Sequence, residues 1–210
     1  MPTHGTALTE EQLAEFIGNG AKALALIAGK LGPQRTHYWD GKSGLMQERL
    51  LKALTPLLLD PIGTVDIPAT TDPLVVRDEF AVGVNGISYI GENFKQWFLP
   101  MVESPTSATT LRYARIIEVS PDEQIMEELG DLKETNLAHV FTLIKFLKTG
   151  KPGGLLTDGY AIFFVKDING VFRVVRVDWR DYAGGWGVDA FEVSDLFRWF
   201  GGYRVFSRDS

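Results

Sequence analysis

The sequence of 210 residues contains no cysteine. This absence excludes a disulfide framework, a thiolate metal site and a cysteine nucleophile. It also fits a protein that works in a reducing compartment. We therefore expect a cytoplasmic protein.

Long apolar runs are missing as well. The apolar stretch at residues 21–28 is interrupted by Lys22 and followed by Lys30, so it is too short to cross a bilayer. The first residues show neither the basic start nor the cleavage pattern of a secretory signal. We expect a soluble protein with no membrane partner.

Basic residues are outnumbered by acidic ones. The chain has 21 Lys and Arg against 27 Asp and Glu, a formal net charge of -6. Binding along a phosphate backbone requires clustered Lys and Arg, so this balance argues against nucleic acid as a partner. A local basic patch stays compatible with the composition.

Histidine is scarce, and the familiar site motifs are absent. His4, His37 and His139 lie far apart, and none has a second His or a carboxylate at ligand spacing. The sequence has no H-E-x-x-H pair, G-x-S-x-G elbow or G-x-G-x-x-G loop. It therefore predicts neither a metal nor a cofactor.

Aromatic residues are concentrated in the last quarter of the chain, from Tyr160 to Phe206. Residues 160–166 and 171–179 are rich in β-branched and aromatic side chains, as strands are. Between them, Asp167-Ile-Asn-Gly170 combines a side-chain acceptor with a glycine, which predicts a tight turn. The segment should form a β-hairpin. Its consecutive apolar residues predict a central position in a sheet that is covered on both faces.

Hydrophobic periodicity predicts the remaining elements. Residues 9–31 open with a capping box and continue with helical spacing, and a second amphipathic stretch follows at residues 45–59. From residue 62 the pattern predicts strands and a tight turn at Asn85-Gly86. The expected strands are residues 63–68, 80–90, 111–119, 186–193 and 203–206. The expected helices are residues 91–99, 121–130 and 135–148, with a short helical turn at 194–200.

These elements predict an α+β fold in two parts. Residues 1–60 form a helical N-terminal segment, a helical hairpin whose apolar stripes need a partner. Residues 62–210 form a mainly antiparallel sheet, covered on one face by the helices of residues 121–148. Association into a homo-oligomer through the N-terminal helices is one way to cover those stripes. The order of the strands does not follow from the sequence.

Several short motifs run through the predicted sheet domain. They include Ile67-Pro-Ala-Thr-Thr71, Ile87-Ser-Tyr-Ile-Gly91, Gly185-Trp-Gly187 and Arg204-Val-Phe-Ser-Arg208. In these motifs the chain resembles a family of small hypothetical proteins from candidate-phylum bacteria with reduced genomes. The resemblance covers about residues 62–208 and implies a shared domain that begins near Ile62. It implies no activity and no site residue.

Acidic residues are frequent in the aromatic-rich region. Asp178 and Asp189 are the candidates for a carboxylate pair, which a hydrolase acting on glycans or phosphoesters would use for acid and base catalysis. Arginines close by in the sequence, such as Arg176 and Arg180, could instead neutralise these carboxylates in ion pairs. Both interpretations stay open at this point.

The candidate ligand-binding residues lie in the same region. Trp179, Tyr182 and Trp186 could stack on sugar rings or unpaired bases, with Arg176 and Arg180 supplying charge. Trp and Tyr are more often part of a core, where they bury large apolar bodies. Periodicity cannot separate an inward from an outward aromatic side chain here.

Three classes of function remain. We favour a non-catalytic binding or protein-interaction module with a protein or a small ligand as partner, which should expose an apolar surface. A small hydrolase should instead show a deep pocket with two facing acids. A single-strand nucleic-acid binder should show a basic strip with aromatic residues.

Overall fold

The computed structural model describes residue 22 and residues 57–148, 153–194 and 196–209. The predicted N-terminal helical hairpin, and any homo-oligomer formed through it, lie outside the described residues. The chain divides into two compact units, Met1–Pro56 and Leu57–Ser210. The second unit is described below. Among the described helices, none has the length and apolar character needed to cross a membrane.

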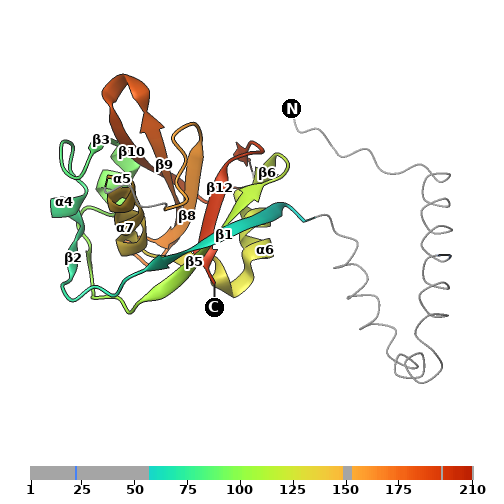
Figure 1. The fold of residues 1–210 in the computed structure, drawn as a ribbon, viewed down its shortest axis with the longest axis horizontal. Helices are drawn as coiled ribbons and strands as arrows, with labels where there is room; N and C mark the ends of the chain where they lie inside the picture. The colour runs from blue at the N-terminus through green and yellow to red at the C-terminus, as the bar shows by residue number, and fades with distance from the viewer. Residues whose placement is uncertain (1–21, 23–56, 149–152, 195, 210) are drawn as a thin grey trace. The chain divides into compact units, whose positions relative to one another are not determined.

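The second unit is built on an eight-stranded sheet (Figure 1). The hydrogen-bonded order is β1-β5-β12-β8-β9-β10-β3, and β7 also pairs with β8. The pairs β12–β8, β7–β8 and β10–β3 are parallel, and the others are antiparallel. The strands are β1 Leu59–Ile67, β3 Ile87–Ile90, β5 Thr109–Ile116, β7 Glu134–Thr135, β8 Tyr160–Lys166, β9 Phe172–Arg180, β10 Gly185–Glu192 and β12 Arg204–Arg208. A mixed fold with a mostly antiparallel sheet is confirmed.

Two short ladders and several helices complete the unit. In the ladders, β2 (Leu74–Val75) pairs with β4 (Val102–Glu103), and β6 (Ser120–Pro121) pairs with β11 (Arg198–Trp199). The α-helices are α4 Val76–Glu79, α5 Glu92–Trp97, α6 Asp122–Leu129 and α7 Leu137–Lys148. Two 3-10 turns, η1 Gly130–Lys133 and η2 Asp181–Ala183, lie between elements.

The helices lie on both faces of the sheet. The first core contains Phe94 of α5 and Ile144 of α7, packed with Phe163 of β8. The second core contains Ile125 of α6, packed with Phe164 of β8. The prediction that the helices of residues 121–148 cover one face is therefore wrong, because α6 and α7 lie on opposite faces (Figure 1). The connecting segment β7 pairs with β8, so the chain passes through the plane of the sheet between the two helices.

The predicted hairpin of β8 and β9 is confirmed. The carbonyl of Asp167 accepts a hydrogen bond from the Gly170 N–H at 2.8 Å, and its Oδ1 accepts one from the Asn169 N–H at 2.8 Å. Gly170 has a φ of 75°, which costs little without a Cβ atom. Both faces of β8 are buried, with Phe163 in the first core and Phe164 in the second.

Three local predictions need correction. Residues 80–90 are not one strand, since the strand covers only Ile87–Ile90; the turn before it is confirmed by φ values of 52° at Asn85 and 82° at Gly86. Arg198–Trp199 is strand β11 rather than part of a short helix, because it pairs with β6. The sheet also begins at Leu59, earlier than the expected start near residue 62.

Candidate functional site

Four candidate residues meet on one face of the sheet. Arg176, Asp178 and Arg180 occupy alternate positions of β9, so their side chains project from the same face. Asp189 of β10 lies directly opposite Arg176 in the antiparallel register. We call these four residues the charged cluster. It lies on the face of the second core, beyond Val174.

Ion pairs link the charged cluster. Arg176 lies between the two carboxylates, with Nη2 3.4 Å from Asp189 Oδ2 and Nε 3.5 Å from Asp178 Oδ1. Arg180 Nε lies 3.3 Å from the second oxygen of Asp178. The four side chains are 13% to 18% exposed. Two positive and two negative groups therefore neutralise one another in a shielded environment.

Aromatic rings flank both arginines. The guanidinium of Arg176 lies 4.7 Å from the ring centroid of Tyr160 and 4.9 Å from that of Phe191. The guanidinium of Arg180 lies 3.7 Å from the ring centroid of Tyr89 on β3. These distances are those of cation–π contacts, which strengthen as the cation loses water.

Two glycines provide the space for the charged cluster. A Cβ atom on Gly187 of β10 would overlap the Nε of Arg180, whose side chain crosses β10 to reach β3. A Cβ atom on Gly91 would overlap the carboxylate of Asp189. The Arg180 side chain therefore packs against the backbone of Gly187, and the Asp189 carboxylate packs against the backbone of Gly91.

Hydrogen bonding within the charged cluster is incomplete. In the described part of the chain, Arg176 Nε, Asp178 Oδ1 and Arg180 Nε are buried and have no hydrogen-bond partner. Their ion-pair contacts are at 3.3 to 3.5 Å, longer than most charge-assisted hydrogen bonds. Charge, rather than well-aligned hydrogen bonds, holds these groups together.

The three aromatic candidates do not form one group. Trp179 and Trp186 lie on the opposite face, where Trp186 is 4% exposed and belongs to the first core. Their rings meet edge to face with centroids 5.2 Å apart. Tyr182 in η2 is 85% exposed, and its hydroxyl accepts a hydrogen bond from Arg180 Nη1 at 3.1 Å. Of the three, only Tyr182 lies at the surface beside the charged cluster.

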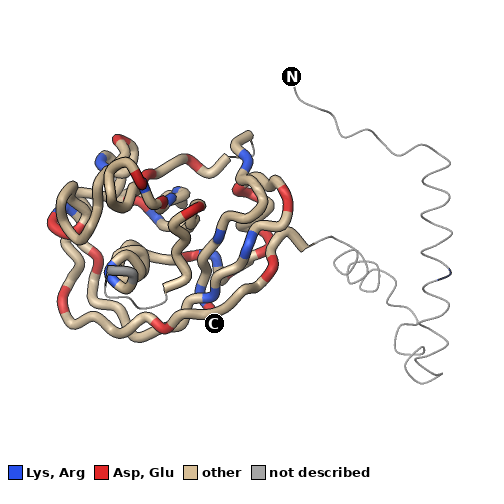
Figure 2. Tube along the Cα trace, turned by 45° about the horizontal axis from the view of Figure 1, so that its top comes forward, with Lys and Arg blue, Asp and Glu red and all other residues tan. Residues whose placement is uncertain are grey.

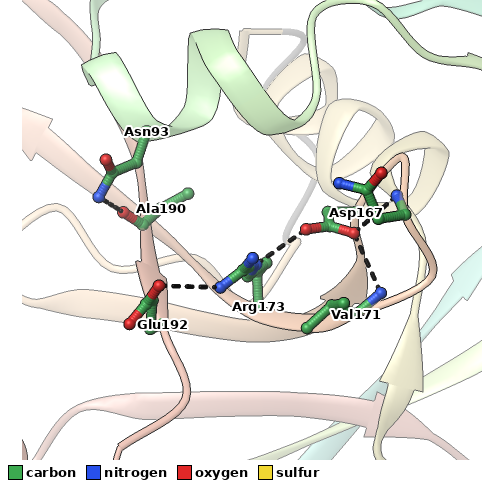
Figure 3. A network of polar contacts seen from close by, with 7 residues as sticks. Asn93, Asp167, Val171, Arg173, Ala190 and Glu192 are labelled. Atoms are coloured by element: carbon green, nitrogen blue, oxygen red, sulfur yellow. Dashed lines mark hydrogen bonds and ion pairs between the residues drawn. The ribbon is translucent and has the colours of Figure 1, made fainter.

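A second arginine network lies at the other end of β9 (Figure 3). Arg173 donates to Asp167 Oδ2 at 2.9 Å and to Glu192 Oε1 at 3.4 Å, and it lies 4.0 Å from the ring centroid of Trp97. Burial alone raises the pKa of Asp167, but hydrogen bonds from Arg173 and from the N–H groups of Val171 and Asn169 outweigh it. The pKa is therefore lowered. This network fixes the hairpin turn against α5 and β10.

Two carboxylates, the buried Asp122 and the half-buried Glu103, serve local structure. Asp122 accepts hydrogen bonds from the Trp199 indole and from the Ser194 N–H, and burial raises its pKa. Glu103 of β4 accepts hydrogen bonds from the N–H groups of Leu137 and Ala138, both at 2.8 Å, and burial raises its pKa too. Glu103 thus satisfies the first free N–H groups of α7.

His139 completes the start of α7. Asn136 Oδ1 accepts from the His139 N–H at 2.9 Å, and His139 Nδ1 accepts from the Asn136 N–H at 3.3 Å. This exchange has the form of a capping box with histidine as the second partner. Burial, with a contribution from the charge of Arg208, lowers the pKa of His139 to about 4. Within the residues that the structure describes, no three His, Asp or Glu side chains group to hold a metal ion.

Sequence reasoning missed an apolar surface at one end of the sheet. Its large side chains are 44% to 87% exposed. We call the following residues the apolar edge: Leu57, Ile117, Val119, Leu196, Phe197 and Phe200. In the sequence, Phe197 and Phe200 fit an amphipathic helical turn, and Ile117 and Val119 fit the continuation of a strand, so neither segment signals an exposed surface.

Backbone contacts hold the segments of the apolar edge together. The Ile117 N–H donates to the Leu58 carbonyl, and the Gly202 N–H donates to the Ile116 carbonyl, both at 2.8 Å. In the ladder of β6 and β11, Trp199 lies opposite Ser120, which places Phe200 beside Val119. Three segments distant in sequence therefore run side by side here, and each of them carries exposed apolar side chains.

The most basic part of the domain is a different one. Figure 2 shows Lys and Arg positions grouped on neighbouring strands near the C-terminus. On β5 and β12, four arginines have acceptors. Arg112 pairs with Asp209 and Arg115 with Asp60, while Arg204 and Arg208 donate to the carbonyls of Gly154 and Asp131. Each of these four arginines is therefore already paired with a carboxylate or a backbone carbonyl of the protein.

Comparison with known proteins adds no relative. No family model, no curated protein and no solved structure matches the chain. The resemblance to small hypothetical proteins stays a prediction, so function has to be inferred from the geometry described above.

Proposed function

We propose that the unit of residues 57–210 is a non-catalytic protein-interaction module of the cytoplasm. The observation that carries this proposal is the apolar edge, where large side chains from three segments are exposed together. Burying apolar surface yields about 25 cal/mol for each Å². Exposed apolar surface to which several segments contribute is typical of protein-binding sites.

The ion pairs of the charged cluster support a non-catalytic role. A hydrolytic carboxylate pair needs two acids that face one substrate in different protonation states. Asp178 and Asp189 instead share one cation, Arg176, and removing either carboxylate from it would leave a charge unpaired in a shielded place. A hydrolase is therefore the weaker hypothesis.

The distribution of cations argues against a nucleic-acid binder. The charged cluster is neutral in sum, and the basic strands β5 and β12 already have acidic or carbonyl acceptors. Binding along phosphates would have to break these contacts.

A small ligand could bind at the charged cluster instead. Tyr182 and Tyr89 are the aromatic side chains beside Arg180 that such a ligand can reach.

Photo-crosslinking tests the proposed function. We would place p-benzoylphenylalanine at position 200 of the full chain, express it in cells of the source organism and irradiate them. The matched control places the same group at position 168, an exposed apolar residue on the hairpin turn. We expect a discrete protein adduct from position 200 only. Equal labelling at both positions, or none at position 200, would contradict the proposal.

A further inference from the structure

Acidic residues lie beside the apolar edge in one segment of the chain. The segment of residues 117–129 carries five acidic residues and no Lys or Arg. Glu118, Glu123, Glu127 and Glu128 in this segment are exposed. Glu118 stands between the apolar edge residues Ile117 and Val119, while one exposed basic residue, Arg198, stands between Phe197 and Phe200.

The C-terminal end of α6 lies close to Leu57 of the apolar edge. Glu128 accepts hydrogen bonds from the N–H groups of Leu58 and Leu59, at 2.7 and 3.1 Å. These bonds hold the last turn of α6 beside the residue that follows Leu57. Acidic side chains therefore lie at both limits of the surface, near Val119 and near Leu57.

The last turn of α6 carries two acidic residues. The carbonyl end of a helix carries a partial negative charge, which Lys or Arg in the last turn normally offsets. The last turn of α6 has no basic residue and instead contains Glu127 and Glu128. Just beyond this turn, Lys133 Nζ donates a hydrogen bond to the carbonyl of Gly130 at 2.9 Å, so one cation of the chain already lies at the carbonyl end of the helix.

We infer, building on the proposed function, that the apolar edge binds a basic amphipathic segment of a partner protein. Apolar side chains of that segment would contact Ile117, Val119 and Phe200. Its Lys and Arg side chains would meet Glu118, Glu123 and Glu127. Such pairing of an apolar centre with opposite charges at the rim sets both the specificity and the association rate of protein complexes.

Two other occupants fit the charges less well. A second copy of this chain would bring the same acidic rim against itself, and like charges across an interface are unfavourable. An anionic membrane surface has the same sign of charge as the rim and would be repelled. Both occupants are distinguished in the test below.

The test measures binding of labelled peptides to the full chain by fluorescence anisotropy. The probe is an amphipathic Leu/Lys peptide of about four helical turns. Its two controls are a scrambled Leu/Lys peptide and an amphipathic Leu/Glu peptide. We expect only the amphipathic Leu/Lys peptide to bind, with an affinity that falls as salt is raised. Equal binding of the scrambled peptide would overturn the inference, because it would reflect charge alone.

Two variants locate the binding site. Phe200→Ser removes an apolar contact, and Glu123→Lys with Glu127→Lys reverses the rim; each should weaken binding of the Leu/Lys peptide about tenfold or more. Glu92→Lys, at an exposed position of α5, is the matched control and should leave binding unchanged. If Phe200→Ser does not fold, the charge-reversed variant still tests the inference. Its two glutamates are exposed, so their substitution should leave the fold intact.

The outcomes separate this inference from the proposed function. A crosslink at position 200 without peptide binding overturns the basic segment and leaves the interaction module standing. Absence of both the crosslink and the peptide binding would overturn both the proposed function and the basic segment. Sedimentation of the full chain as a dimer that Phe200→Ser dissociates would assign the surface to a second copy. Capture by anionic vesicles that Phe200→Ser abolishes would assign it to a membrane.

Discussion

The indole Nε1 of Trp199 donates a hydrogen bond to Asp122 Oδ1 at 2.5 Å, and both residues are 1% exposed. This contact joins β11 to the first turn of α6. Two residues of the apolar edge are close to this contact in sequence, because Phe200 follows Trp199 and Val119 precedes Asp122 by a few residues. A buried polar link thus anchors the segments from which these exposed residues come.

We expect Asp122→Ala to destabilise the domain. The substitution leaves the Trp199 N–H and the Ser194 N–H without their acceptor, and a buried unsatisfied donor costs about 1–3 kcal/mol. Urea unfolding followed by tryptophan fluorescence measures the loss. The exposed Asp158→Ala is the control and should change the free energy of unfolding little. Equal effects of the two substitutions would show that the buried link contributes nothing.

Acid should destabilise the domain through His139. Its pKa is lowered from 6.5 to about 4, so between these values the unfolded chain binds a proton that the folded chain does not. The free energy of unfolding therefore falls as pH drops from about 6.5 to about 4, by roughly 3 kcal/mol at one pKa unit per 1.36 kcal/mol.

The variant His139→Asn checks this pH dependence. Asn can still accept from the Asn136 N–H but does not titrate, so its free energy of unfolding should fall less over the same range. Denaturant titrations at pH 4.5, 5.5 and 7 compare the two proteins. The same acid dependence in wild type and variant would contradict the assignment to His139.

Gly187→Ala should displace the Arg180 side chain. The added Cβ atom would overlap Nε, so the guanidinium would have to leave its position against the Tyr89 ring. We expect a loss of about 1–3 kcal/mol in the free energy of unfolding. In the background Arg180→Ala the same substitution should cost much less, because the overlapping group is gone. Additive effects in this double-mutant cycle would show that the two residues do not interact.

Asp178→Asn should act on stability rather than on turnover. Removing this carboxylate charge leaves Arg176 and Arg180 close together with only Asp189 to compensate them. We expect a loss of about 2–4 kcal/mol, as for other buried pairs that lose one partner. Asp181→Asn, exposed on η2, is the matched control. A hydrolytic activity that Asp178→Asn abolishes without any loss of stability would restore the hydrolase hypothesis.

Local elements of the fold could be predicted because their causes are local. The side chain and carbonyl of Asp167, followed by Gly170, set the hairpin turn, and the limits of β8 follow from its run of apolar residues. Prediction failed where tertiary pairing replaced local preference. Residues 198–199 carry a helical pattern, yet they pair with β6 and bury Trp199.

The candidate site could be predicted in part. The alternation in β9 is enough to put Arg176, Asp178 and Arg180 on one face once the strand is known. Which face Trp179 and Trp186 occupy depends on the helices that cover the sheet, and these contacts join residues far apart in the chain. The apolar edge has no signal in any single segment, since three segments must meet to form it.

By itself the sequence determined the class of the fold, the central hairpin and the balance of charge, because turn chemistry and hydrophobic periodicity act over a few neighbouring residues. The tertiary structure alone decided that α6 and α7 lie on opposite faces, that Arg176 neutralises both candidate carboxylates, and that Phe200 and Val119 are exposed together. The physical reason is that burial and ion pairing depend on distances between segments, and the order of the strands sets those distances.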